Sequence, residues 1–276
     1  MIYLQLAGRL GNQLFQWAAA LKVQESHGQV CLVYDDFHQS KPTPILKELT
    51  SGKIEIRKVN SIGRILQIND KFRIGNLFLK QIINSEQNPY SELDRLPTRT
   101  KVLRGYFQNW RNIIEFEDTI YEQLNDVVNK IFSNSIKLQT YEKELTEYCS
   151  IHVRRGDYQD SNFGTLAPRF YVATKDFRSK PILLFTDQED LPEEYKKAIN
   201  PDYIFTPKHL SNEETFALMS RGSKVAIANS TFSWWAGFLS MKNGGQVLLP
   251  HPWIKGDSPK SAFQYPGMHQ EKAIFN

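Results

Sequence analysis

The sequence predicts an α/β protein with two halves, each built on a parallel β-sheet, and three observations support this. A strand, a glycine-bearing turn, a helix and a second strand follow one another at the start of the chain, as in a βαβ unit. From residue 148 onward, five apolar strand-like runs alternate with four helical patterns, which is typical of a doubly wound sheet. The length of 276 residues is sufficient for two domains.

The first half begins with the βαβ pattern. We expect a strand at residues 2–6, a turn at 8–13, a helix to about residue 27 and a strand at 30–34. Leu14, Trp17 and Leu21 recur at helical spacing, and Gly28 is a typical residue to end a helix. Further along, residues 103–110 indicate a strand that runs into a turn, and residues 112–132 indicate a helix.

The second half shows a clear alternation of elements. We expect strands at residues 148–153, 182–186, 203–205, 224–228 and 246–249, and helices at 168–177, 191–198, 212–220 and 231–241. The predicted domains are an N-terminal α/β domain at residues 1–145 and a Rossmann-like domain at residues 146–255. Residues 256–276 are expected to pack back onto the first domain.

Composition excludes several classes of protein. Hydrophobic residues make up 41% and aromatic residues 12%, which is too much apolar area for a disordered chain. Cys31 and Cys149 lie in strand-like runs and are expected to be reduced core thiols. No secretory signal and no membrane span are evident, so we expect a cytoplasmic protein. A net charge of +4 fits an anionic small molecule and is too weak to indicate nucleic acid.

Residues 57–80 carry six basic residues and a single acidic residue, Asp70. One interpretation is a solvated surface. The other is a docking surface for anionic lipid or for a lipid-linked acceptor, which predicts peripheral contact with the inner membrane face.

Ligands of open α/β sheets bind beyond the carboxyl ends of the strands, so the residues there are the first candidates. The strand at 148–153 leads into the segment HVRRGDY, residues 152–158, in which His152 and Arg154 share one face of the strand. Arg154 and Arg155 stand before a glycine turn, and arginine suits phosphate. In the alternative, one arginine pairs with Asp157 and neither contacts a ligand. For His152, a structural role and a ligand contact are equally supported.

A second candidate segment is NSTFSWW, residues 229–235, before an apolar helix. Ser230 or Thr231 can cap that helix, and the same helix start can bind a phosphate. Capping explains one hydroxyl group, whereas Ser233 adds a third. Trp234 and Trp235 are expected in the core.

Asp187 follows the strand at 182–186 and is expected either to accept hydrogen bonds from a base or ribose or to cap the next helix. The turn at 8–13 lacks the full dinucleotide fingerprint, and no Walker motif is present. Asp35-Asp36 is not an Asp-x-Asp triad, and the histidines show no metal-ligand spacing. We therefore expect no metal and no cofactor, so that arginine and a helix dipole neutralise any bound pyrophosphate.

Together these segments resemble the α-1,2-fucosyltransferase family, glycosyltransferase family 11, in its bacterial type. The resemblance rests on GRLGNQLFQ at residues 8–16, HVRRGDY at 152–158 and NSTFSWW at 229–235, with FTD at 185–187 and LMS at 218–220 in support. Each motif alone is modest, but their order and spacing together are specific.

The resemblance implies a GT-B fold with two facing Rossmann-like domains. It also implies GDP-β-L-fucose as donor and a galactose 2-hydroxyl, in an O-antigen-type or other oligosaccharide, as acceptor. Transfer inverts the anomeric centre in a single displacement without metal. The resemblance places Arg154 on the donor phosphate, with Arg155 and His152 beside it, and Asp187 on the nucleotide. The family's phosphate-binding turn corresponds to Asn229, Ser230, Thr231, Phe232 and Ser233, and Gly11, Asn12 and Gln13 are expected to orient acceptor or fucose.

The general base and the acceptor site stay open at this point. Asp157 is the nearest carboxylate in the motif, and Asp35, Asp36, Glu25 and His27 are further candidates. Acceptor contacts are expected from loops at residues 35–45, 85–110 and 159–166.

Two rival functions are weighed against this one. An α-1,6-fucosyltransferase shares the His-x-Arg strand, but the FSWW segment argues against it. A nucleotide-sugar-binding or glycan-binding protein without turnover is disfavoured by the intact Arg154, Arg155 and Ser230.

Overall fold

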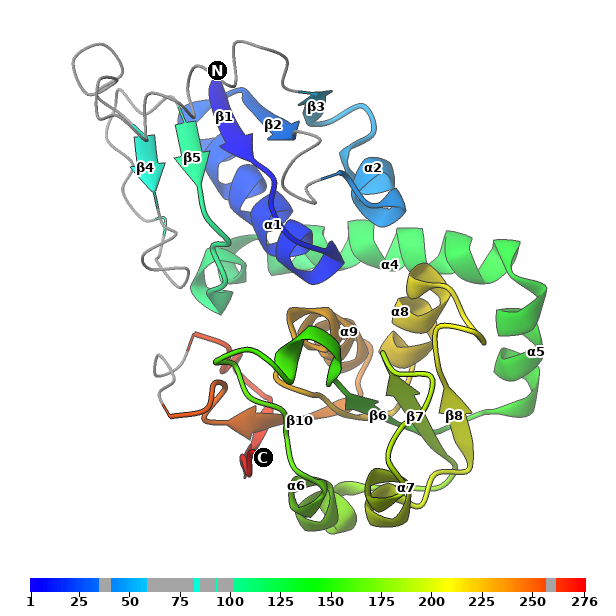
Figure 1. Cartoon of the computed structure of the whole chain (residues 1–276). Coiled ribbons are helices and arrows are strands. Elements are labelled where there is room, and N and C mark those ends of the chain that lie inside the picture. The colour runs from blue at the N-terminus through cyan, green and yellow to red at the C-terminus, as the bar shows by residue number, and fades with distance from the viewer. Residues whose placement is uncertain (35–40, 59–81, 85–92, 94–101, 257–261) are drawn as a thin grey trace. The chain divides into compact units, whose positions relative to one another are not determined.

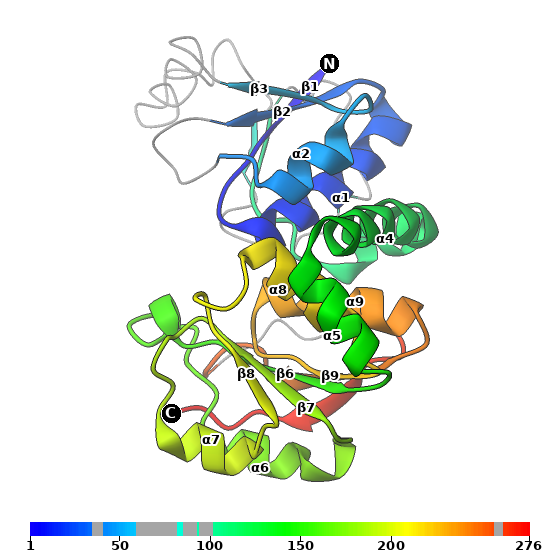
Figure 2. The same ribbon diagram turned by 90° about the vertical axis from the view of Figure 1, so that its right-hand side faces the viewer.

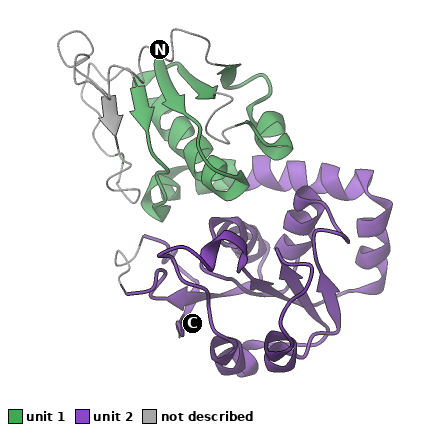
Figure 3. Ribbon diagram, viewed as in Figure 1, with its two compact units in different colours: residues 1–120 green, residues 121–276 purple. Residues whose placement is uncertain are grey.

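The computed structural model describes residues 1–34, 41–58, 82–84, 93, 102–256 and 262–276 (Figure 1). The chain divides into two compact units, residues 1–120 and residues 121–276 (Figure 3). Each unit contains one parallel β-sheet, so the predicted α/β class with two parallel sheets is confirmed.

The first unit has the sheet order β3-β2-β1-β5-β4, with every neighbouring pair parallel. Its strands are β1 (Ile2–Gln5), β2 (Val30–Tyr34), β3 (Glu55–Lys58), β4 (Ile82–Asn84) and β5 (Val102–Arg104), and its helices are α1 (Leu10–His27) and α2 (Pro44–Thr50). Short 3₁₀ turns follow at Trp110–Asn112 and Ile114–Phe116. The predicted βαβ start is confirmed, and Gly28 ends α1 with a φ of 83° that favours glycine.

Buried Gln16 of α1 links the ends of two neighbouring strands of this sheet, β1 and β5. Its Nε2 donates a hydrogen bond to the carbonyl oxygen of Gly105 at 2.8 Å, and its Oε1 accepts one from the Ala7 amide at 3.1 Å. These backbone groups lie just beyond β5 and β1, where the ladder ends, and a buried amide satisfies them.

The second unit has the sheet order β11-β10-β9-β6-β7-β8, again fully parallel. Its strands are β6 (Cys149–Val153), β7 (Ile182–Thr186), β8 (Tyr203–Phe205), β9 (Lys224–Ala226), β10 (Gln246–His251) and β11 (His269–Lys272). Its helices are α4 (Glu117–Asn134, which begins in the first unit), α5 (Ile136–Glu144), α6 (Pro168–Ala173), α7 (Glu193–Ile199), α8 (Asn212–Ser220) and α9 (Thr231–Lys242). In chain order the strands run 3-2-1-4-5-6, the doubly wound arrangement.

Helices cover both faces of this sheet: α6 and α7 lie on one face, and α8 and α9 on the other (Figures 1 and 2). The face under α6 and α7 buries Ile151, Phe170 and Tyr195. On the other face Trp234 and Trp235 are fully buried and meet edge to face at 5.2 Å, which confirms their predicted place in the core.

Both cysteines are free, buried thiols, as expected. Burial raises the pKa of Cys31 and of Cys149, so both thiols stay protonated at neutral pH.

Residues 121–144 lie in the second unit, although we expected them in the first domain. Polar contacts join α4 and α5 to α8. Ser135 donates a hydrogen bond to Glu214 at 2.6 Å, and Arg221 pairs with Glu142 and lies 3.7 Å from the ring centroid of Phe132. Helical periodicity shows that a helix has a buried face, but it does not show which sheet supplies the partner.

The last segment of the chain also differs from expectation. Its described part adds β11 as an edge strand beside β10 of the second unit, where we expected it to pack back onto the first. Backbone hydrogen bonding draws an extended segment to an open strand edge.

The basic stretch at residues 57–80 lies mostly outside the described residues. Of its members, Arg57 and Lys58 belong to β3, and Arg57 pairs with Glu55. Among the described helices, none combines the length and the apolar character that crossing a bilayer requires.

Candidate functional site

The strand order of the second sheet reverses between β6 and β9. In a parallel sheet such a reversal opens a space for ligands beyond the carboxyl ends of the two strands. Ile151 of β6 is paired with Ala226 of β9, so the next three residues along each strand lead to Arg154 and Asn229. The two strongest motifs of the sequence therefore converge at this edge of the second unit.

Arg154 is held between two carboxylates. Its Nη2 donates a hydrogen bond to Oδ1 of Asp157 at 2.5 Å, and its Nη1 lies 3.0 Å from Oδ2 of Asp187. The guanidinium carbon is 5.2 Å from the ring centroid of Tyr158, a cation–π distance. Its Nε is buried and has no hydrogen-bond partner in the described part of the chain. The predicted pairing with Asp157 is therefore present, and one donor of Arg154 is still unused.

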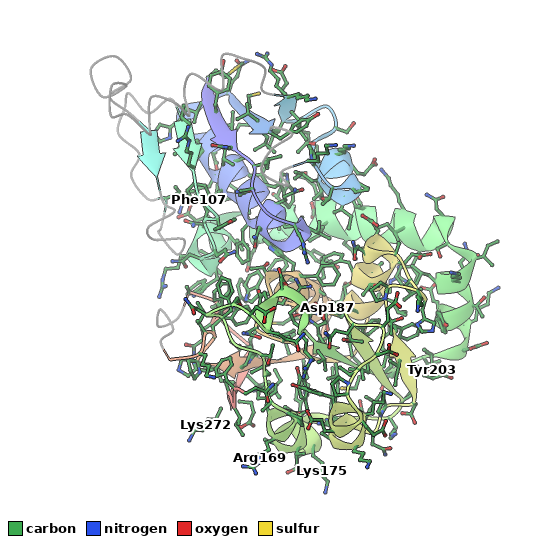
Figure 4. All side chains as sticks on the ribbon, viewed as in Figure 1. Phe107, Arg169, Lys175, Asp187, Tyr203 and Lys272 are labelled. Atoms are coloured by element: carbon green, nitrogen blue, oxygen red, sulfur yellow. The ribbon has the colours of Figure 1, made fainter. Side chains whose placement is uncertain are left out.

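Asp187, labelled in Figure 4, follows β7. It contacts the turn after β6 through Arg154 and Arg155. Besides its ion pair with Arg154, its Oδ1 accepts a hydrogen bond from the Arg155 amide at 3.0 Å. A Cβ atom on Gly156 would collide with Oδ2 of Asp187, so glycine is needed for this close approach. The expectation that Asp187 caps the next helix is wrong, because α7 begins at Glu193 and its N-cap is Pro192.

Arg155 points to a different set of partners from Arg154. Its Nε donates to Gln188 at 3.0 Å, its Nη2 donates to Gln159 at 2.7 Å, and its guanidinium lies 4.8 Å from the ring centroid of Tyr195. The two adjacent arginines thus have different surroundings. Arg154 contacts carboxylates where the strand order reverses, and Arg155 forms hydrogen bonds with residues of the segments that follow β6 and β7.

His152 is buried, with 5% of its surface exposed, and its ring centroid lies 6.0 Å from that of Phe232. Nδ1 is buried and, among the described residues, finds no hydrogen-bond partner. Burial lowers the pKa of His152 to about 4; the nearby Asp187 charge opposes this decrease and Arg154 adds to it. The imidazole is therefore neutral at physiological pH.

In the turn after β9, the Ser230 amide donates a hydrogen bond to the carbonyl oxygen of Ala228 at 2.8 Å. Ser230 is the N-cap residue of α9, yet its side chain makes no capping hydrogen bond within the described structure. Ser233 is fully buried and donates to the carbonyl oxygen of Ser230 at 3.2 Å. Thr231 and Phe232 begin the helix, whose first turn has no acidic residue. The positive end of α9 therefore carries no compensating side-chain charge in its first turn.

Asn229 connects this turn to the loop after β6. Its Nδ2 donates to the carbonyl oxygen of Gly164 at 3.0 Å, and its Oδ1 is buried without a hydrogen-bond partner in the described residues. Buried side-chain oxygens without a hydrogen-bond partner are uncommon in native proteins, so Oδ1 of Asn229 is available to accept a hydrogen bond from a ligand.

Gly11, Asn12 and Gln13 lie in the first turn of α1, in the first unit. Gln13 is buried, and its amide group is occupied by backbone groups: it donates to the carbonyl oxygen of Lys41 at 2.9 Å and accepts from the Thr43 amide at 2.9 Å. Oδ1 of Asn12 accepts a hydrogen bond from Gln108 at 2.8 Å. Gln13 therefore has a structural role, because its amide group links α1 to the backbone at Lys41 and Thr43. Asn12 instead forms a hydrogen bond with another side chain, that of Gln108.

The structure adds residues that sequence reasoning missed. Gln188, Gln159 and Tyr195 surround Arg155, and Gln108 meets Asn12 across 96 positions of sequence. Gln188 directly follows the FTD segment, so adjacency could have indicated it. Gln108 and Gln159 lie in loops that were expected to contact the acceptor, but neither was named as a single residue, and nothing in the pattern indicated Tyr195.

Of the remaining base candidates, Glu25 and His27 are in the last turn of α1, at the opposite end of that helix from Gly11. Asp35 and Asp36 lie outside the described residues. In the described part of the chain, no group of three or more His, Cys, Asp or Glu side chains is placed to hold a metal ion.

Comparison with known proteins gives a consistent result. A family model described as glycosyl transferase family 11 matches residues 1–263. The chain is 27% identical to the O-antigen biosynthesis glycosyltransferase WbnK of Escherichia coli, over 93% of this chain and 96% of that protein. It is 25% identical to an α-1,2-colitosyltransferase of Escherichia coli, over 95% of each chain. It is also 23% identical to galactoside α-(1,2)-fucosyltransferase 2 of Pongo pygmaeus, over 93% of this chain and 75% of that one.

Proposed function

Because the chain belongs to glycosyltransferase family 11, we propose that it transfers L-fucose from GDP-β-L-fucose to the 2-hydroxyl group of a galactose in a glycan. Transfer would invert the anomeric centre in one displacement that uses no metal. The GT-B arrangement and an O-antigen-type or related oligosaccharide acceptor are part of the same proposal. The observation that carries it is Arg154, held at the strand reversal with a buried, unpartnered Nε.

The ion pairs around Arg154 are compatible with the binding of an anionic ligand. The Arg154 guanidinium faces Asp157 and Asp187, and Arg155, the next residue, contacts Asp187 through its backbone amide. Counting the charge of Arg155, the two arginines and two aspartates are formally neutral without a ligand. The Asp157 side chain is 54% exposed, and an exposed ion pair contributes little stability. A pyrophosphate oxygen can therefore replace Asp157 at low cost, while the less exposed Asp187 keeps Arg154 in place.

Unsatisfied polar atoms at the same edge support a polar ligand. Nδ1 of His152, Nε of Arg154 and Oδ1 of Asn229 are all buried without hydrogen-bond partners in the described residues. Leaving such atoms unpaired costs about 1–3 kcal/mol each, so a bound ligand that pairs with them would recover free energy. A nucleoside diphosphate offers both acceptors, on its phosphates, and donors, on its ribose.

The chemistry follows from where charge develops. As an acceptor hydroxyl attacks the anomeric carbon in line, the bond to the β-phosphate oxygen breaks and GDP carries the departing electron pair. Arg154, and the positive end of α9 near Ser230 and Thr231, would stabilise that charge. Asp157 is the proposed general base, and Asn12 is proposed to orient acceptor or fucose.

A direct assay tests the function. The protein is incubated with GDP-fucose and with β-1,3- or β-1,4-linked galactosides; we expect release of GDP and a product whose linkage is α-1,2 by NMR. An α-1,6 linkage would contradict the proposed linkage, and GDP binding without turnover would indicate a binding protein. The similarity to an α-1,2-colitosyltransferase suggests colitose as an alternative donor sugar. A parallel reaction with a nucleotide-linked colitose tests this alternative.

Membrane attachment through residues 57–80 is a separate part of the proposal. Sedimentation with liposomes tests it: pelleting with anionic lipid at low salt, lost at high salt, is expected, and no pelleting at low salt would contradict it.

A further inference from the structure

An exposed aromatic ring lies beside the arginine site. Phe163 is 46% exposed and stacks on Tyr158, with ring centroids 5.2 Å apart and planes 28° from parallel. The ring of Tyr158 in turn lies 5.2 Å from the guanidinium carbon of Arg154. The guanidinium and the two rings are therefore connected from the partly buried Arg154 to the surface of the second unit.

The loop that presents Phe163 is held firmly. The carbonyl oxygen of Phe163 accepts hydrogen bonds from the Lys255 amide at 3.1 Å and from Nδ2 of Asn229 at 3.4 Å. The next residue, Gly164, has a φ of 74°, and a Cβ atom there would press on Lys255 and Phe275. The backbone position of Phe163 is thus determined from both sides.

Residues 273–276 hold the rest of the same loop. The Ala167 amide donates to the carbonyl oxygen of Ile274 at 2.7 Å, and the Asn276 amide donates to that of Thr165 at 3.0 Å. A well-anchored loop that leaves a phenylalanine ring half in water forgoes the free energy of burying that ring. Preorganised exposure of this kind is what a binding surface requires.

We propose that Phe163, backed by Tyr158, is the platform on which the galactose of the acceptor stacks. This inference rests on the proposed function. One face of a galactopyranose presents mainly C–H groups, which pack on a flat aromatic ring through dispersion and burial of apolar area. The 2-hydroxyl group stays at the rim of the sugar and remains free to react.

The depth of the two regions separates acceptor from donor. The unpartnered atoms of His152, Arg154 and Asn229 are buried, which suits the enclosed diphosphate of a nucleotide. Phe163 is exposed, which suits a glycan whose other sugar residues extend into solvent. Guanine could also stack on an aromatic ring, so the experiment separates the two ligands.

The test compares Phe163→Ala with Phe163→Trp and with Tyr203→Ala. Tyr203 is an aromatic residue of β8 in the same unit, 38% exposed, and lies apart from Asp187 (Figure 4), so it is a matched control. For Phe163→Ala we expect the acceptor KM to rise about tenfold, the effect of losing ~1.4 kcal/mol of contact. The Kd for GDP, measured by calorimetry, should stay within twofold, Phe163→Trp should restore the acceptor KM, and Tyr203→Ala should resemble the wild type.

An unchanged acceptor KM in Phe163→Ala would overturn the platform. If the Kd for GDP is at the same time tenfold weaker, the ring is assigned to guanine. If the wild type transfers no sugar, the proposed function fails, and the platform is then judged by saturation-transfer NMR with galactosides alone. Equal transfer to the galactoside ring protons in wild type and Phe163→Ala would overturn the inference.

Discussion

The carboxylate of Asp187 lies 3.0 Å from Nη1 of Arg154, although 33 positions separate the two residues in the chain. Adjacent parallel strands create this contact, because β6 and β7 end side by side with Val153 paired to Thr186. The second oxygen of the carboxylate accepts a hydrogen bond from the Arg155 amide, so Asp187 fixes both the direction of the guanidinium and the turn that carries it.

Arg154→Ala should lower kcat/KM with GDP-fucose by about 10²-fold, the order of effect observed when one preorganised donor to a developing charge is lost. Arg154→Lys should also lose most of the activity, because a single ammonium group cannot replace the fork that spans Asp157 and Asp187. Steady-state kinetics with release of GDP measures both variants. Activity within threefold of the wild type in Arg154→Ala would contradict the role.

Asp187→Asn should lower kcat about tenfold, since it weakens a charge-assisted hydrogen bond of at least ~1.5 kcal/mol to Arg154. GDP should bind equally well or more tightly, because a negative charge near the pyrophosphate is removed. The asparagine can still accept the hydrogen bond from the Arg155 amide, so the fold should persist. Binding of guanosine, followed by NMR, is the second readout: a large loss there would show that Asp187 contacts the ribose or base.

Gly156→Ala should displace the Asp187 carboxylate without unfolding the protein. The added Cβ atom meets the end of a side chain, which can move, and the movement carries Oδ2 away from Arg154. We expect a loss of kcat of about tenfold, similar to that of Asp187→Asn. A double-mutant cycle checks the cause: in the Asp187→Ala background, Gly156→Ala should have little further effect on kcat. Additive losses would mean that the glycine acts independently of Asp187.

Asp157→Asn examines the proposed general base. If Asp157 removes the proton from the acceptor hydroxyl, kcat should fall at least about 10²-fold and the acid limb of the pH–rate profile should disappear. The structure also gives Asp157 a contact of 2.5 Å with Arg154, which is a structural role for the same carboxylate. Retained kcat with an unchanged acid limb would remove Asp157 from the mechanism and leave it as the ion-pair partner of Arg154.

His152 should make the stability of the second unit depend on pH. Its pKa is lowered from 6.5 to about 4, so between these values the unfolded chain binds a proton that the folded chain does not. The contribution of neutral His152 to the free energy of unfolding is therefore fully present above pH 6.5, and it is lost as the pH decreases toward 4. At pH 5 the loss is about 2 kcal/mol, 1.36 kcal/mol for each pH unit below 6.5. The charged groups that influence it are Asp187 and Arg154.

His152→Gln isolates this contribution from that of other titrating groups. Thermal unfolding of both proteins at pH 7 and pH 5 should show a smaller decrease in Tm for the variant, by several degrees. Parallel decreases in the two proteins would show that His152 is not the residue whose protonation destabilises the fold.

The elements of the second unit could be predicted closely because their signals are local. The strand expected at residues 182–186 is found as Ile182–Thr186, and the helix expected at 212–220 is found as Asn212–Ser220. Short apolar runs bounded by polar turns indicate buried parallel strands, and a Ser-x-x-Glu capping box marks the start of α8. In the first unit, residues 103–110 were expected to be a strand that runs into a turn. The strand is Val102–Arg104, and positive φ at Gly105 and Phe107 then ends the extended chain.

The motifs that form the candidate site could be predicted from the sequence, but the contacts that single residues make within it could not. Two adjacent arginines before a glycine indicate an anion site. They do not indicate that the Arg155 side chain donates hydrogen bonds to Gln188 and Gln159. Gln13 belongs to a predicted motif, yet its amide is occupied by backbone groups of Lys41 and Thr43. Beyond the end of a strand, the alternation of side chains no longer sets their direction, and contacts with other segments decide it.

The α/β class, the free thiols, the buried tryptophans and the three motifs that identify the family were all predictable from the amino-acid sequence. These features depend on residue type, spacing and burial, which a single chain displays. Four features could be seen only in the folded chain: Asp187 pairs with Arg154, residues 121–144 belong to the second unit, β11 is an edge strand of its sheet, and Phe163 is exposed beside the arginine site. Each of these depends on which segments become neighbours, and periodicity records that a surface is buried without recording what buries it.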